Sequence, residues 1–394
     1  MNIKNKNIIV LTAVYISFLA LGMPDGAFGV AWPGMRYELG LGLDRAFLLV
    51  VSHSVFYALA GSLMGRMAAF LKLPNVNILG LGLILLGMGG FAFSPNLYFL
   101  IIFTMVLGMG MGMVDSSLNA FAAKYFAARH MNWLHCFWGL GGSISPIIMS
   151  QMVILFGWRT GYVSIFALQG IMFTFVLITL LKGAWVMTSE NSVKAEEEPA
   201  PEKFLTERRY PIIQVIIFMV YAAFEYAITF WTTSVMLEGR GLYIGVAGLY
   251  PAVYLGSMTA GRIVMGYASH RMSNTTMIRF GLALSIAGLG ILTVSNNFIG
   301  MAMVGFGFGP VFPCLMHETG RRYSPEATTK LVGYQIAGVG VGVGLSTFGM
   351  GRLLEGISLN ALFPAVIIGM TMVALLNEII EFAMRRQGLY GAGK

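Results

Sequence analysis

Charged residues are scarce in this sequence. Aspartate, glutamate, lysine and arginine make up 11% of its 394 residues, whereas hydrophobic residues make up 57%. A soluble domain carries about 25% charged residues. A soluble chain this apolar could not cover its surface with polar groups, so the solvent for most of it must be lipid. The scarcity of charge therefore excludes an ordinary soluble protein.

Cysteine is also scarce, since the chain contains only Cys136 and Cys314. Two isolated thiols form neither a disulfide framework nor a metal cluster. The sequence lacks H-E-x-x-H and G-x-S-x-G, and nothing in it brings together a nucleophile, a base and an oxyanion site. We therefore expect no enzymatic activity, no cofactor and no metal.

Long apolar runs, by contrast, recur along the whole chain. A hydrocarbon core about 30 Å thick requires about 20 helical residues. We predict twelve membrane spans, at 8–34, 46–71, 76–93, 96–123, 133–157, 160–186, 211–237, 243–268, 276–295, 298–319, 329–354 and 360–384. Strands are disfavoured because open sheet edges cannot lie in lipid. The first run is too long for a cleaved signal peptide, so we expect the mature chain to begin at Met1.

The formal net charge of +8 could indicate nucleic-acid binding, but its distribution argues against that partner. With a cytoplasmic N-terminus, 20 of the 25 lysines and arginines fall on the cytoplasmic side of the predicted spans and 5 on the opposite side. Such a bias is the positive-inside rule of membrane proteins. We therefore expect both termini in the cytoplasm and the protein in the plasma (bacterial inner) membrane.

A polar segment interrupts the apolar pattern near the middle of the chain. Its sequence, TSENSVKAEEEPAPEKFLTERRY, is highly charged and contains two prolines, which is typical of a solvated linker. We predict an N-terminal six-helix bundle over residues 1–187, a cytoplasmic linker over 188–210 and a C-terminal six-helix bundle over 211–394.

The two halves carry similar short patterns. A Gly-Arg pair lies toward the cytoplasmic end of both the second and the eighth span, which makes Arg66 and Arg262 candidate gating residues. Asp25 in the first span and Glu225 in the seventh are each followed, seven or six residues later, by a tryptophan. Repeated six-span halves around a linker indicate a two-bundle transporter with a site between the bundles.

Three glycine-rich stretches resemble nucleotide-binding loops when taken in isolation. They are GMGMGMV (108–114), GFGFGP (305–310) and GVGVGVG (338–344). A nucleotide loop requires a strand, a tight turn and a helix N-terminus, whereas all three stretches are embedded in apolar helix. We interpret them as packing surfaces, because small residues let membrane helices approach closely.

Three acids lie well inside predicted spans: Asp25, Asp115 and Glu225. Placing an ionised carboxylate at mid-membrane costs at least ~2.5–3.5 kcal/mol, so such residues are functional by default. The structural alternative is an acid held by backbone groups or by a neighbouring basic side chain. Asp115 and Asn119 are i,i+4 neighbours and can face one aqueous cavity. A carboxyl group shielded from water can exchange a proton near neutral pH, as a proton-coupled carrier requires.

Interior aromatic, amide and imidazole side chains complete the candidate site. Tryptophan can stack on a sugar ring while Asn and Gln bind its hydroxyl groups. Packing or interfacial roles are the alternative for each of these residues. The candidates for substrate contact are Asp25, Asp115, Asn119, Asn132, Trp32, Trp138, Tyr226, Trp231, Tyr254 and Gln335, and those for proton coupling are Asp25, Asp115, Glu225 and His135.

The whole chain resembles the major facilitator superfamily. Within that superfamily, its motifs are similar to those of the fucose/glucose–galactose proton symporters. The resemblance rests on GMPDGAFGVAWPGM (22–35), GMGMGMVDSSLNAF (108–121), MNWLHCFWGLGGSISP (131–146), YAAFEYAITFW (221–231) and GFGPVFP (307–313). It implies proton-coupled uptake of a monosaccharide by alternating access, with Asp25 and Asp115 in proton coupling and substrate recognition. The superfamily has an aspartate before the arginine that follows span two, where this sequence has Gly65.

We therefore predict an all-α membrane protein with twelve transmembrane helices in two six-helix bundles, the major facilitator fold. The expected function is secondary active transport, with a small-molecule substrate, protons and the lipid bilayer as partners and a monomer as the working unit. A proton-driven exporter of amphiphilic compounds or drugs is the first alternative, since it would use the same acids with the opposite flux. A non-transporting membrane sensor is the remote alternative.

Overall fold

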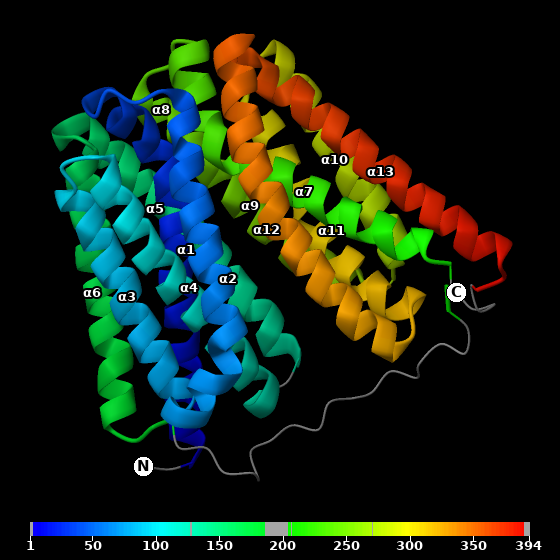
Figure 1. Cartoon of the computed structure of the whole chain (residues 1–394), viewed down its shortest axis with the longest axis horizontal. Coiled ribbons are helices and arrows are strands. Elements are labelled where there is room, and N and C mark those ends of the chain that lie inside the picture. Colours follow the sequence, from blue (N-terminus) through cyan, green and yellow to red (C-terminus); the bar gives the residue numbers. More distant parts are fainter. Residues whose placement is uncertain (1–2, 127, 186–203, 206, 270, 390–394) are drawn as a thin grey trace. The chain divides into compact units, whose positions relative to one another are not determined.

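The computed structural model describes residues 3–126, 128–185, 204–205, 207–269 and 271–389, and this part of the chain consists of helices and short connections (Figure 1). The helices are α1 Ile3–Glu38, α2 Ala46–Leu71, α3 Leu73–Phe93, α4 Leu97–Tyr125, α5 Ala128–Phe156, α6 Trp158–Leu181, α7 Arg209–Ser234, α8 Ile244–Ala247, α9 Leu249–Ala268, α10 Asn274–Val294, α11 Phe298–Arg322, α12 Pro325–Gly356 and α13 Leu362–Arg386. The predicted all-α fold class is confirmed.

Eleven of the described helical segments are long and apolar enough to cross a membrane. The predicted eighth span, 243–268, is not one of them, and it is divided into α8 and the 20-residue α9. Pro251 lies in the first turn of α9. It has no backbone N–H to donate to the carbonyl of Ala247, so the helix breaks between the two segments.

The chain forms two compact units. Unit 1 comprises Met1–Glu196 and Gly241–Gly256, and unit 2 comprises Glu197–Arg240 and Ser257–Lys394. Most of the predicted linker, residues 188–203 and 206, lies outside the described residues. The predicted division into bundles at 1–187 and 211–394 therefore stays a prediction.

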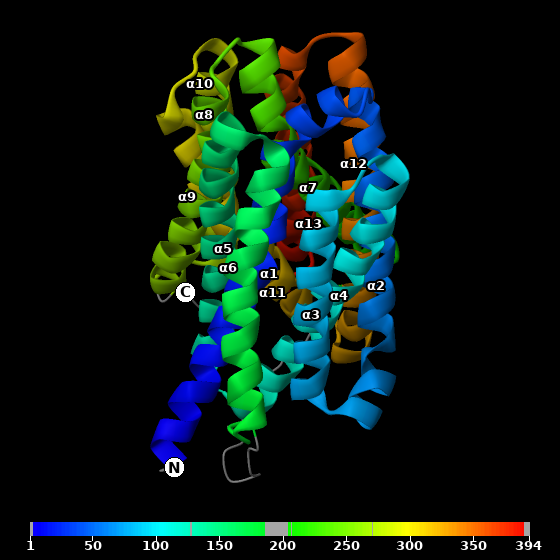
Figure 2. The ribbon, with the colours of Figure 1, turned by 90° about the vertical axis from the view of Figure 1, so that its left-hand side faces the viewer.

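Within unit 1, α1 packs against α5 and α6, while α4 packs against α2 and α3 (Figure 2). The alternating glycines of α4 face these last two neighbours. A Cβ atom at Gly112 would lie 2.4 Å from the carbonyl oxygen of Tyr57 on α2, and one at Gly110 would lie 2.7 Å from that of Gly80 on α3. Only glycine therefore permits both close approaches, which supports the packing interpretation of this stretch.

An arginine binds three helices together at the end of unit 1 where α1 terminates. Arg159 of α6 pairs with Glu38 of α1 at 2.9 Å. The same guanidinium donates to the carbonyl oxygens of Ala92 and Ser94, at 3.0 and 2.8 Å, where α3 ends. Trp158 donates its indole N–H to Glu38 at 2.6 Å. The two Arg159 bonds to Ala92 and Ser94 satisfy backbone carbonyls that a helix C-terminus leaves without partners.

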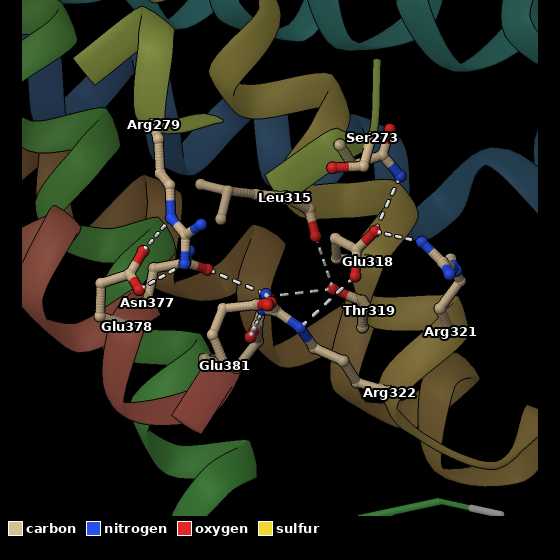
Figure 3. Close-up of polar contacts among 12 residues, drawn as sticks. Ser273, Arg279, Leu315, Glu318, Thr319, Arg321, Arg322, Asn377, Glu378 and Glu381 are labelled. Atoms are coloured by element: carbon tan, nitrogen blue, oxygen red, sulfur yellow. Dashed lines mark hydrogen bonds and ion pairs between the residues drawn. The ribbon is translucent and has the colours of Figure 1, made fainter. Parts of the chain in front are cut away.

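Unit 2 contains a cluster of polar contacts around Arg322 (Figure 3), in which Arg322, Asn377 and Glu381 are almost completely buried. Arg322 at the end of α11 is 0% exposed, and it pairs with Glu381 of α13 at 2.6 Å. Its guanidinium also donates to Asn377 and to Gln214 of α7, each at 2.9 Å. One buried cation thus connects α7, α11 and α13. A buried charge is tolerated when it is paired and hydrogen-bonded in this way.

Candidate functional site

The Asp115 carboxyl group on α4 is held from two helices. The amide of Asn119, one turn later on α4, donates to Oδ1 at 2.8 Å, and the hydroxyl of Tyr57 on α2 donates to Oδ2 at 2.5 Å. Asp115 and Asn119 are both half-buried. The predicted i,i+4 partnership is present in the structure. Hydrogen bonds to an ionised carboxylate are short and about twice as strong as neutral ones.

The Asp25 carboxyl group on α1 is held from α5. The indole N–H of Trp138 donates to Asp25 Oδ2 at 3.1 Å. The two backbones meet one turn earlier, because a Cβ atom at Gly22 would lie only 1.9 Å from the Trp138 carbonyl oxygen. Trp138 is thus a hydrogen-bond donor to the first-span acid. The sequence alone predicts a role only for its ring, as a surface for stacking on a sugar.

Asp25 and Asp115 are close enough for their charges to interact. Like charges repel where water is scarce, so a proton on either carboxyl group lowers the repulsion between them. We call Asp25, Tyr57, Asp115, Asn119 and Trp138 the acid cluster. All five residues belong to unit 1, and they come from α1, α2, α4 and α5.

Two further candidates on α5 lie near the start of that helix. The side chain of His135 is exposed, and its ring packs edge-on against Phe18 of α1, with centroids 5.8 Å apart. The side chain of Asn132 lies outside the described part of the structure.

Three of the selected aromatic residues are completely buried. Trp32, Trp231 and Tyr254 are each 0% exposed. The ring centroids of Trp32 and Phe28 lie 6.0 Å apart, and those of Trp231 and Phe230, which pack edge-on, lie 4.7 Å apart. Among the described residues, the indole N–H of Trp231 has no hydrogen-bond partner. A buried indole N–H usually has a partner, so Trp231 is an exception among the described residues.

The remaining candidates lie in several parts of the chain. In unit 2, Arg262 donates to the Gly309 carbonyl at 3.4 Å, and its positive charge acts on half-buried Glu225. Tyr226, also half-buried, stacks on Phe230. Gln335 is buried and donates to Thr319 at 2.9 Å, which places it beside the polar cluster of Arg322. In unit 1, Arg66 is exposed.

Sequence reasoning missed Tyr57. A signal was available, because His53 and Tyr57 are one turn apart in the middle of the predicted second span and therefore share a face. Tyr57 carries no charge, so the cost of an intramembrane charge does not select it. The sequence does not reveal which face of α2 points toward α4, and only the structure shows that the Tyr57 hydroxyl reaches Asp115.

Comparison with known proteins identifies similar chains. The model of the Major Facilitator Superfamily matches residues 14–347. The glucose/mannose transporter GlcP of Bacillus subtilis (strain 168) is 22% identical over 302 residues, which cover 72% of this chain and 74% of GlcP. The hexuronate transporter of the same organism is 23% identical over 227 residues, which cover 55% of this chain and 54% of that transporter.

Solved structures give the same fold. The nucleoside transporter NupG has a TM-score of 0.75 and 12% sequence identity, with 96% of this chain and 100% of that chain covered. A structure of the peptide transporter POT has a TM-score of 0.71 and 12% identity, with 94% of both chains covered. At this identity the likeness shows the fold alone.

Proposed function

Because the chain belongs to the Major Facilitator Superfamily, we propose that this membrane transporter couples proton entry to the uptake of a small polar solute, a monosaccharide. The observation that carries the proposal is the acid cluster. Two intramembrane carboxyl groups, Asp25 and Asp115, interact electrostatically, and each is held by donors that carry no charge. A neighbouring cation would hold an acid in its ionised form, whereas neutral donors leave proton exchange possible.

Protonation of Asp115 is the step that we propose for coupling. Asp25 is its partner, because a proton on either carboxyl group relieves the repulsion between the two. A neutralised cluster costs less to enclose in a low-dielectric interior, so loading with a proton favours the state in which the site is closed or reoriented. A proton can shift that equilibrium only because it binds one state better than the other.

A monosaccharide suits the donors and acceptors of the candidate site. Carboxylate, amide and indole groups bind hydroxyl groups, and aromatic faces cover the apolar side of a sugar ring. The likeness to a glucose/mannose transporter and to a hexuronate transporter supports this substrate class. We assign substrate contact and proton coupling to the residues selected from the sequence, with Glu225 and His135 as further proton-coupling candidates and Arg66 and Arg262 as gating candidates.

The topology proposed from the charge bias places both termini in the cytoplasm of a plasma (bacterial inner) membrane. A single chain supplies both units, so we propose that the monomer is the working form. The cytoplasmic position of the termini is tested with cysteines introduced near each end of the chain. In intact cells, these cysteines are expected to be protected from a membrane-impermeant labelling reagent.

Transport by the purified protein in proteoliposomes tests the proposal. An imposed inward proton gradient is expected to drive accumulation of radiolabelled glucose, and a protonophore is expected to abolish that accumulation. Mannose, a hexuronate and a nucleoside, added in excess as unlabelled competitors, define the substrate class. Accumulation that is unaffected by the protonophore would contradict proton coupling, and competition only by the nucleoside would contradict a monosaccharide substrate.

A further inference from the structure

Both oxygen atoms of the Asp115 carboxyl group already have donors from different helices. Asn119 donates to Oδ1 from within α4, and Tyr57 donates to Oδ2 from α2. A phenol hydroxyl has a single hydrogen to donate, and an ionised carboxylate can only accept. When Asp115 is ionised, both donors are used, and the Tyr57 bond connects that ionised state to a second helix.

The approach of α2 to α4 brings the Tyr57 hydroxyl to this position. On α4 the residues at the crossing are glycines. A Cβ atom at Gly108 would lie 2.3 Å from the carbonyl oxygen of His53 on α2, and one at Gly112 would lie 2.4 Å from that of Tyr57. No side chain separates the backbones there. The Tyr57–Asp115 bond therefore lies at a place where the backbones of α2 and α4 are in direct contact.

We propose that Tyr57 is a positioning residue for Asp115 that reports the protonation of this acid to α2, an inference that rests on the proposed proton coupling. When a proton binds Oδ2, the new O–H donates to the Tyr57 oxygen, and the Tyr57 hydrogen turns away from the carboxyl group. One O–H bond forms at Oδ2, and no other covalent bond changes. The direction of the hydrogen bond between α2 and α4 is thereby reversed.

The other titratable groups near Asp115 can be named helix by helix. On α1, Asp25 interacts with Asp115 through its charge. On α2, the ring of His53 lies 6.0 Å from that of Tyr57, and its Nε2 meets the Met111 sulfur at 3.3 Å. The α3 sequence contains no titratable residue.

On α5, His135 is exposed, and His130 meets the hydroxyl of Tyr15 at 2.7 Å. The Trp138 indole, from the same helix, donates to Asp25 and not to Asp115. The donors with a described hydrogen bond to the Asp115 side chain are therefore Tyr57 and Asn119.

Infrared difference spectroscopy of the purified, reconstituted protein tests this proposal without any solute. Asp115→Asn identifies the carboxyl C=O band of Asp115 by its loss. In Tyr57→Phe we expect the band to form at a pH about one unit higher, which is a tenfold gain in proton affinity, because a donor to the ionised form is lost. The matched control is Tyr98→Phe on the same helix as Asp115, since Tyr98 is 77% exposed; it is expected to leave the band unchanged.

Incorporation of 3-fluorotyrosine at position 57 supplies a variant that keeps the shape of the side chain. Fluorination makes the hydroxyl a stronger donor, so the band is expected to form at a lower pH than in the wild-type protein. Shifts of opposite sign in the two variants are a response that a purely structural role would not produce. An unchanged band in the fluorinated protein, or in a folded Tyr57→Phe variant, overturns the proposal. Failure of the transport assay alone would contradict the proposed function and leave this result standing.

Discussion

At the scale of single residues, neutral donors hold the two acids of unit 1. Trp138 donates a hydrogen bond to Asp25, while Tyr57 and Asn119 donate to Asp115. Hydrogen bonds to charged groups contribute about 1.5–3 kcal/mol each, so they offset much of the cost of keeping a carboxylate among apolar helices. None of these donors carries a charge of its own, and the cluster as a whole can therefore change charge by one proton.

The Trp138 bond gives a prediction at this scale. Trp138→Phe keeps an aromatic ring but removes the donor to Asp25, so we expect the free energy of unfolding to fall by about 1–3 kcal/mol. Trp133→Phe is the matched control, because Trp133 is 43% exposed on the same helix, and surface changes usually alter stability by less than about 0.5 kcal/mol. Denaturant unfolding in detergent measures both variants. Equal losses would show that the indole N–H of Trp138 contributes nothing specific.

At the scale of helices, glycines and buried charges fix which elements pack together. Within unit 1, Gly110 faces α3 and Gly112 faces α2. Within unit 2, α11 repeats this arrangement, since Gly307 faces α10 and Gly309 faces α9. The same spacing therefore builds the same three-helix contact in each unit, which is the structural basis of the similarity between the two halves.

Substitution of Gly112 tests the α2–α4 contact. In Gly112→Ala the added Cβ atom meets the Tyr57 carbonyl oxygen, so α2 must move, and we expect a loss of roughly 1–3 kcal/mol in the free energy of unfolding. A Cβ atom at Gly349 of α12 would meet nothing within 4 Å. Gly349→Ala is therefore expected to be neutral or stabilising by up to about 1 kcal/mol, because alanine favours helix. A stable Gly112→Ala variant would contradict the close packing.

The buried cluster of unit 2 predicts a contrast between two glutamates on α13. Glu381→Gln removes the closest carboxylate of the fully buried Arg322, and breaking a buried pair in this way costs about 3–5 kcal/mol. Glu378→Gln removes the partner of Arg279, whose pair is nearly half exposed (44% and 45%), so we expect a loss of about 0–1 kcal/mol. Thermal unfolding of the two variants in one detergent compares them. A larger loss from Glu378→Gln would contradict the assignment.

At the scale of the whole molecule, the sequence predicts the fold class correctly, and it selects the two carboxyl groups of unit 1 as candidates. Run length predicts membrane helices, and the cost of an intramembrane charge selects Asp25 and Asp115. The partners of these acids could not be predicted, because a helix that is apolar on most of its surface does not reveal its rotation about its axis. Tyr57 lies 58 residues from Asp115, and Arg322 lies 59 residues from Glu381. The break at Pro251 is a local signal that hydropathy alone did not detect.

Proton-coupled passage of a solute through the whole molecule is the central claim, and Asp115→Asn tests it most directly. The measurement compares two activities of the same proteoliposomes: accumulation of labelled substrate under an inward proton gradient, and exchange with preloaded substrate without a gradient. We expect the variant to lose accumulation and keep exchange, because residue 115 can then no longer bind and release a proton. Asp44→Asn, in the connection before α2, is expected to keep both activities. Normal uphill accumulation by Asp115→Asn would contradict the account.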